Sequence, residues 1–169
     1  MFEKGDIVTY AAAGVCTVEG TMENKVKGVN KRYLVLKPFY ESNYAIYVPT
    51  DNETLIGRIR GVMSKEDIYS LIEALPDINS EWIDDDTKRN ELFRQTLKSG
   101  DRKEIMKMLR VLYLHRQEQL DNGRKFHTAD EHFLKEAEHI LFDEFAVVLG
   151  IEPDEVTGFI TDRLNRAKA

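Results

Sequence analysis

The sequence predicts an α+β protein with two domains: a small β-barrel or curled antiparallel sheet over residues 1–60, and an all-α bundle of about five helices over residues 61–169. Two observations predict this division. In the first 50 residues apolar and polar residues alternate, which is the period of a half-buried strand. After Pro49 apolar residues recur every three to four positions, which is the period of a helix packed on one face. Hydrophobic residues make up 42% of the chain, enough for a buried core.

The first part contains four segments with strand patterning, at residues 6–10, 13–19, 32–37 and 44–49. Gly14 and the polar segments 27–30 and 41–43 separate them. We therefore expect four or five short strands connected by hairpins. A sheet this small has an exposed edge, which a strand of a partner protein can extend.

Five helices are expected in the second part, over about residues 64–75, 80–97, 102–120, 128–149 and 153–166. Ser64 is an N-cap serine with Asp67 three residues on. Thr128 and Glu131 have the spacing of a capping box, and Gly150 ends the helix that they begin. Helix signals of this kind are local, so each predicts a boundary without reference to the rest of the chain.

The net charge of −6 hides an uneven distribution. Residues 87–125 carry 11 basic and 5 acidic side chains, whereas residues 63–86 carry 1 and 8, and residues 126–169 carry 4 and 10. A basic segment between two acidic ones points to an anionic partner, although a solvated helix face gives much the same count. The helical part as a whole is net −7, which leaves open an acidic surface that recruits another protein.

The sequence contains no group of residues typical of an enzyme or a metal site. Cys16 is the only cysteine, lies in a predicted strand and has no basic neighbour, so we expect a small buried residue. Glu136 and His139 have the Glu-x-x-His spacing of di-iron helices, but the second copy that such a site needs is missing. We predict no catalytic residue, no metal and no cofactor. Without a signal peptide or a spanning segment, we expect a cytoplasmic protein that does not associate with membranes.

Basic side chains that can form a positive surface lie on the second and third expected helices and in the loop that follows. They are Lys88, Arg89, Arg94, Lys103, Lys107, Arg110, Arg116, Arg124 and Lys125. The start of the fourth helix adds backbone N–H groups that bind phosphate. Trp82 is the only tryptophan and has two interpretations. It packs a helix start onto the core, which the residues alone favour, or it is an exposed aromatic that inserts into a distorted step of the DNA minor groove.

Motifs in both parts, in their order and spacing, resemble those of one family. In the first part they are Phe2-x-x-Gly5-Asp6-x-Val8-x-Tyr10-x-x-x-Gly14-Val15, the strand 33–37 and Val48-Pro49. In the second they are the segments 97–101, 112–114, 128–131 and 146–150. These motifs are similar to those of the CarD/CdnL family of bacterial transcription regulators over nearly the whole chain. The first part resembles the Tudor-like module that CarD proteins share with transcription-repair coupling factors, so we expect a Tudor/SH3-like fold there.

The resemblance implies a transcription regulator that binds the β subunit of RNA polymerase and stabilises the promoter open complex. Promoter DNA is contacted in the minor groove and along the backbone at the upstream edge of the bubble, without sequence specificity. Polymerase-binding positions fall at Asn24, Lys25 and Tyr47, where family members often have arginines. The candidate DNA contacts are Trp82, Lys88, Arg89, Arg116, Arg124, Lys125 and His132. We expect a monomer.

Two departures from the family pattern affect these expectations. Residues 11–13 are alanines where the family often has Pro and His. The family tryptophan lies about one helical turn nearer to Ser99-Gly100-Asp101, at the position of Asp86. Trp82 is therefore the wedge on a helix longer by one turn, or the wedge is missing. The alternative function is a polymerase-bound adaptor whose acidic helical domain recruits another protein and does not contact DNA.

Overall fold

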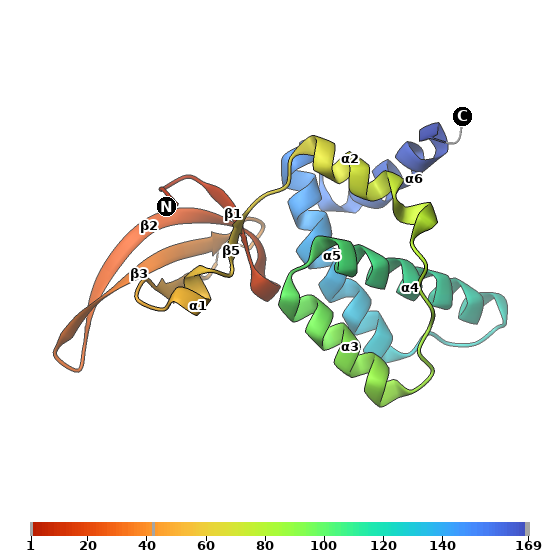
Figure 1. Ribbon diagram of the computed structural model, residues 1–169, viewed down its shortest axis with the longest axis horizontal. Coiled ribbons are helices and arrows are strands. Elements are labelled where there is room, and N and C mark those ends of the chain that lie inside the picture. Colours follow the sequence, from red (N-terminus) through yellow and green to blue (C-terminus); the bar gives the residue numbers. More distant parts are fainter. Residues whose placement is uncertain (1, 42, 168–169) are drawn as a thin grey trace. The chain divides into compact units, whose positions relative to one another are not determined.

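The computed structural model describes residues 2–41 and 43–167, which form two compact units, Met1–Val62 and Met63–Ala169 (Figure 1). The first unit is a five-stranded antiparallel sheet with one short helix, and the second consists of helices. The predicted α+β layout is confirmed. Within the described residues no helix has both the length and the apolar character needed to cross a membrane.

The sheet contains β1 (Ile7–Tyr10), β2 (Gly14–Val26), β3 (Val29–Pro38), β4 (Ile46–Pro49) and β5 (Ile59–Gly61), in the order β4-β3-β2-β1-β5. The β2–β3 hairpin is longer than the sequence pattern suggested (Figure 1). Its turn residues Lys27 and Gly28 both have positive φ, of 50° and 81°, as a tight two-residue hairpin turn requires. A register shift between Val18 and Gly20 marks a bulge, which bends β2.

One core belongs to the sheet. It consists of Val8, Cys16, Val18, Leu34, Leu36, Val48 and Ile59. Cys16 is fully buried in it, as expected, and burial raises the pKa of its thiol to about 11, so the thiol stays protonated at neutral pH. Two short elements complete the unit, the 3-10 turn η1 (Ala11–Ala13) and the helix α1 (Glu53–Ile56). Residue 42 of the expected turn at 41–43 lies outside the described residues.

The helical unit contains α2 (Lys65–Glu73), α3 (Asp86–Ser99), α4 (Arg102–Asp121), α5 (Thr128–Leu149) and α6 (Val156–Ala167), with the 3-10 turns η2 (Leu75–Asp77) and η3 (Pro153–Glu155). Their apolar faces form a second core, in which Leu112, Leu141 and Phe145 are completely buried. Two predicted caps are confirmed: Ser64 accepts from the Asp67 N–H at 3.1 Å, and Gly150 ends α5 with a left-handed backbone.

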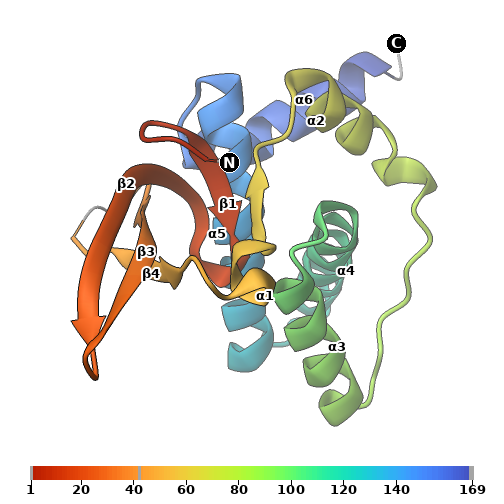
Figure 2. The ribbon, with the colours of Figure 1, turned by 60° about the vertical axis from the view of Figure 1, so that its left-hand side comes forward.

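The structure corrects the start of one helix and the capping residue of another. The second helix of the unit, α3, begins at Asp86 and not near residue 80, because Asp85 accepts from the Lys88 N–H at 3.0 Å and caps it. Residues 78–85, which we call the strap, form neither helix nor strand and lead from η2 to α3 (Figure 2). The N-cap of α5 is His127 and not Thr128, so the expected capping box is absent. Asp130 is completely buried there, inside the first turn.

Candidate functional site

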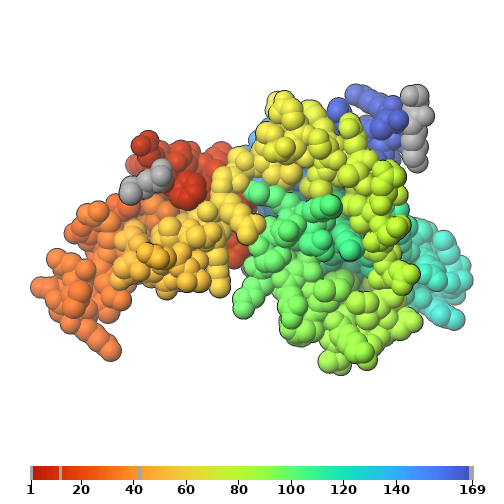
Figure 3. Space-filling view, viewed as in Figure 1, coloured from red at the N-terminus to blue at the C-terminus, as the bar shows by residue number. Residues whose placement is uncertain are grey.

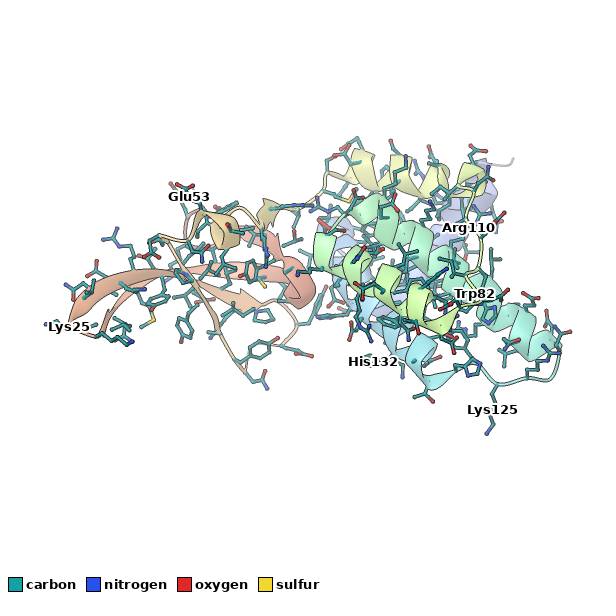
Figure 4. The ribbon with its side chains drawn as sticks, turned by 60° about the horizontal axis from the view of Figure 1, so that its bottom comes forward. Lys25, Glu53, Trp82, Arg110, Lys125 and His132 are labelled. Atoms are coloured by element: carbon teal, nitrogen blue, oxygen red, sulfur yellow. The ribbon has the colours of Figure 1, made fainter. Side chains whose placement is uncertain are left out.

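Two of the three expected polymerase contacts share one face of the sheet. Asn24 and Tyr47 line a shallow hollow of about 410 Å³ together with Met22 and Tyr33. Strand register brings them together, because Met22 is paired with Tyr33 and paired residues project to the same face. Lys25 follows Asn24 directly, so strand alternation turns it to the opposite face, at the end of the long hairpin (Figure 4).

Sequence reasoning missed Met22 and Tyr33. The signal was present, since Met22 lies two residues before Asn24 in a strand and therefore on the same face. Tyr47 is 53% exposed although it stands in the middle of β4. β4 is one of the two edge strands of the sheet and pairs only with β3, so its outer backbone edge has no strand partner within the described residues. An open edge of this kind is where a strand of another protein can extend a sheet.

The candidate DNA contacts of the helical unit separate into exposed and internal side chains. Lys88, Arg124 and Lys125 are exposed. Arg116 is half-buried, with its guanidinium carbon 5.2 Å from the ring centre of Tyr113. His132 is exposed on α5, and its Nε2 lies 2.7 Å from a carboxylate oxygen of Glu136. These five side chains are accessible to a ligand to different degrees, whereas Arg89 and Trp82 are held by the protein itself.

Arg89 is turned into the protein, with 5% of its side chain exposed. Its Nε donates to Asp130 Oδ1 at 3.2 Å, and its Nη2 donates to Asp130 Oδ2 at 3.4 Å and to Asp86 Oδ1 at 2.6 Å. Its Nη1 donates to the carbonyl oxygens of Ile83 at 2.8 Å and Asp84 at 3.4 Å. A guanidinium has five N–H donors, so in this conformation Arg89 has none left for a phosphate.

Trp82 lies half-buried in the middle of the strap (Figure 4). Its ring is stacked on His115 of α4, with 3.6 Å between centroids and 4° between planes. The Arg89 guanidinium carbon lies 4.4 Å from the indole centroid, and the ring of Phe93 lies 6.4 Å away, edge to face. Trp82 therefore packs at the rim of the helical core, and it is carried by an extended segment and not by a helix.

The loop before α5 brings two cations to a helix start. The Arg124 N–H donates to the Gln119 carbonyl at 2.8 Å, and the Gln119 side chain donates to the Lys125 carbonyl at 3.5 Å, which fastens the loop to α4. The next residue, Phe126, has its ring 6.3 Å from that of His115, beside the Trp82 stack. No side-chain cap covers the N-terminus of α5 at His127. Helix N–H groups with two nearby cations favour binding of a phosphate.

Two further arginines of the basic segment have internal partners. Arg110 donates to the carbonyl oxygens of Leu75 and, at 3.2 Å, of Ile78. Arg102 binds both carboxylate oxygens of Glu144, at 2.8 and 2.6 Å, and the side chain of Glu144 is 2% exposed. Much of the arginine charge that suggested an anionic partner therefore stabilises the fold.

The histidines and acids of α5 pair with each other along the helix. Glu136 is paired with His132, and His139 Nδ1 lies 2.7 Å from Asp143 Oδ2. Within residues 2–41 and 43–167, no three His, Cys, Asp or Glu side chains are grouped closely enough to hold a metal ion.

Two family models match the chain. Residues 2–63 match the model described as the CarD-like/TRCF RID domain, and residues 70–161 match the model described as the CarD C-terminal domain. The second match alone covers more than half of the chain. The sheet face with Asn24 and Tyr47 lies within the first match, and the strap, α3 and the start of α5 lie within the second.

Proposed function

The chain belongs to the CarD-like family of RNA polymerase-interacting, non-enzymatic transcription factors, and we propose that it stabilises the promoter open complex. In this proposal the sheet binds the β subunit of the polymerase. The helical unit contacts DNA at the upstream edge of the bubble, mainly through phosphates. Phosphate contacts fix position without reading sequence, so promoter choice comes from the polymerase and from DNA deformability.

The observation that carries the DNA contact is the exposed pair Arg124 and Lys125 directly before the N-terminus of α5. Lys88, exposed on the first turn of α3, adds a third cation, and half-buried Arg116 a fourth. Each neutralised phosphate releases a counterion, which makes such binding strongly dependent on salt. We keep Trp82 and His132 in the proposed surface, and we assign Arg89 no phosphate.

In this chain the side chains that line the proposed polymerase-binding hollow are uncharged. Asn24 and Tyr47 carry no charge where relatives often have arginines, and with Met22 and Tyr33 they line a hollow that suits an apolar side chain. The open edge of β4 supplies backbone groups for an added strand. Backbone pairing and apolar contact therefore replace ion pairs in the proposed interface.

The proposal is tested with Arg124→Glu and Lys125→Glu combined in one variant. The lifetime of open complexes formed by purified holoenzyme on a linear promoter is measured after a heparin challenge, together with a footprint of the upstream bubble edge. We expect the wild-type chain to lengthen the lifetime, and we expect the variant to lose most of that effect while still binding polymerase. Lys65→Glu is the matched control, since Lys65 is exposed on α2 and should change nothing.

The adaptor alternative has an observation in its favour, because the exposed strap acids Glu81, Asp84 and Asp85 form an acidic surface in the same unit. It predicts that the double charge reversal leaves the promoter effect intact. That result, or a wild-type chain that does not change the lifetime, would contradict open-complex stabilisation by direct DNA contact.

A further inference from the structure

We propose that the buried ion pair between Arg89 and Asp130 positions the DNA-contacting surface of the helical unit, and that neither side chain touches DNA. This inference rests on the proposed function and states what holds that site in shape. It also separates two adjacent residues, Lys88 and Arg89, that look equivalent in the sequence.

The strap has no regular secondary structure, so its position depends on hydrogen bonds from side chains of neighbouring helices. At its beginning, Arg110 from α4 holds the carbonyl oxygens of Leu75 and Ile78. At its end, Arg89 from α3 holds those of Ile83 and Asp84. Arginine side chains thus donate to strap carbonyl oxygens that would accept from backbone N–H groups in a helix or a sheet. In the space-filling view the strap lies on the surface of the unit (Figure 3).

Three parts of the proposed DNA surface meet at the Arg89 guanidinium. Its Nη1 holds the strap, its Nη2 holds Asp86 at the start of α3, and its Nε and Nη2 hold Asp130 in the first turn of α5. Asp130 is 41 residues away in the chain and completely buried. A planar fork with a fixed geometry sets the relative placement of the three segments more strictly than a single contact would.

The same guanidinium also fixes the tryptophan. It lies 4.4 Å from the centre of the Trp82 ring, which is stacked on His115. His115 in turn lies beside Phe126, directly after Arg124 and Lys125. A change at Asp130 is therefore expected to reach Trp82 through Arg89, although Asp130 is not in the strap.

The first arm of the test uses Trp82 as a reporter, since it is the only tryptophan. Asp130→Asn removes the charge that pairs with Arg89. In case that variant does not fold, the combined variant Arg89→Met and Asp130→Leu replaces both charges by apolar side chains, a change that buried ion pairs often tolerate. We expect a red-shifted Trp82 emission and about a twofold or larger rise in acrylamide quenching, with helix content by circular dichroism and polymerase binding unchanged.

Glu91→Gln is the matched control, because Glu91 is an exposed acid of α3 that pairs at 4.0 Å with the exposed Arg94. It should leave the Trp82 emission as in the wild type. Unchanged emission and quenching in both Asp130 variants would overturn the inference, and this readout needs neither polymerase nor DNA. It therefore remains decisive even where open-complex stabilisation itself is contradicted.

The second arm uses the salt dependence of DNA binding to distinguish a residue that positions the surface from one that contacts phosphate. A residue that binds a phosphate lowers the slope of log K against log salt by about one when it is removed. We expect that loss for Lys88→Ala in binding to upstream-fork DNA. The combined variant Arg89→Met and Asp130→Leu, which removes the Arg89 cation, should weaken this binding at every salt concentration and leave the slope unchanged. A slope reduced as in Lys88→Ala would show that Arg89 contacts phosphate, and would overturn the inference.

Discussion

At the scale of single residues, the sequence indicates which side chains are buried, but it does not indicate which charged side chains pair inside the protein. Asp130 stands on the apolar face of α5, three, four and seven residues before the buried Phe133, Leu134 and Ala137. An acid in such a position needs a buried cation, and this signal was available in the sequence. The identity of the cation that pairs with Asp130 was not available, because the basic segment contains several arginines and any of them could have been the buried one. Only the fold selects Arg89.

His115 predicts how stability depends on pH. Burial lowers its pKa below the ordinary value of 6.5, Arg89 and His127 lower it further, and Asp130 and Glu118 act in the opposite direction. The unfolded chain then binds the proton more readily than the folded one. The contribution of His115 to stability is therefore complete above pH 6.5 and is lost as the pH falls through the lower pKa of the folded state.

We expect the Tm of the helical unit to fall more between pH 7.5 and 5.5 in the wild type than in His115→Gln, in thermal unfolding followed by circular dichroism. All other titratable side chains are present in both proteins, so the difference isolates the His115 imidazole. Equal pH dependence in the two proteins would contradict this assignment.

At the scale of elements, some capped helix ends were predictable, and the start of α3 was not, although Asp85 caps it. Ser64 accepts from a backbone N–H three residues on, as its spacing from Asp67 in the sequence predicts. The strap has helix-compatible residues, yet the carbonyl oxygens of Ile83 and Asp84 accept from Arg89. Hydrogen bonds from arginine side chains of α3 and α4 to strap carbonyl oxygens thus override a weak local helix propensity. The length of the β2–β3 hairpin was missed for a related reason, since its exposed end lacks the alternation that burial imposes.

Two glycines of neighbouring helices predict opposite effects of the same substitution. Gly150 ends α5 with φ +70°, where a side chain is strained although nothing lies within 4 Å of its Cβ position. Gly158 lies inside α6 without a positive φ, and its Cβ position is equally open. We expect Gly150→Ala to lower the free energy of unfolding by about 1 kcal/mol. We expect Gly158→Ala to raise it by up to about 1 kcal/mol.

Urea unfolding followed by Trp82 fluorescence measures both effects in the helical unit. Gly150→Asn is the control for backbone strain, since asparagine tolerates a left-handed backbone better than alanine. It should lower the free energy of unfolding by less than Gly150→Ala does. A loss as large for asparagine as for alanine would mean that strain at this position is not the cause.

At the scale of the whole molecule, the division into sheet and helices was visible in the sequence because it rests on a change of hydrophobic period, which is local. The placement of the sites was not, because each depends on pairing between distant segments. The hollow forms only when β2, β3 and β4 pair in the observed register. The strap is held in place only when Arg89 of α3 pairs with Asp130 of α5. Family resemblance supplied positions such as Asn24 and Tyr47 where periodicity supplied none.

The two cores have no residue in common, which predicts that each unit can unfold by itself. Leu36 is completely buried in the sheet core and Phe145 in the helical core. Replacing a buried leucine by alanine costs about 2–5 kcal/mol, and replacing a buried phenylalanine costs about 3–5 kcal/mol. Because Trp82 packs against the helical core, we expect Phe145→Ala to lower the urea midpoint of its fluorescence and Leu36→Ala to leave that midpoint unchanged. Amide exchange in β2 and β3 should respond in the opposite way. A Trp82 midpoint lowered by both substitutions would show that the sheet and the helices unfold as one cooperative unit.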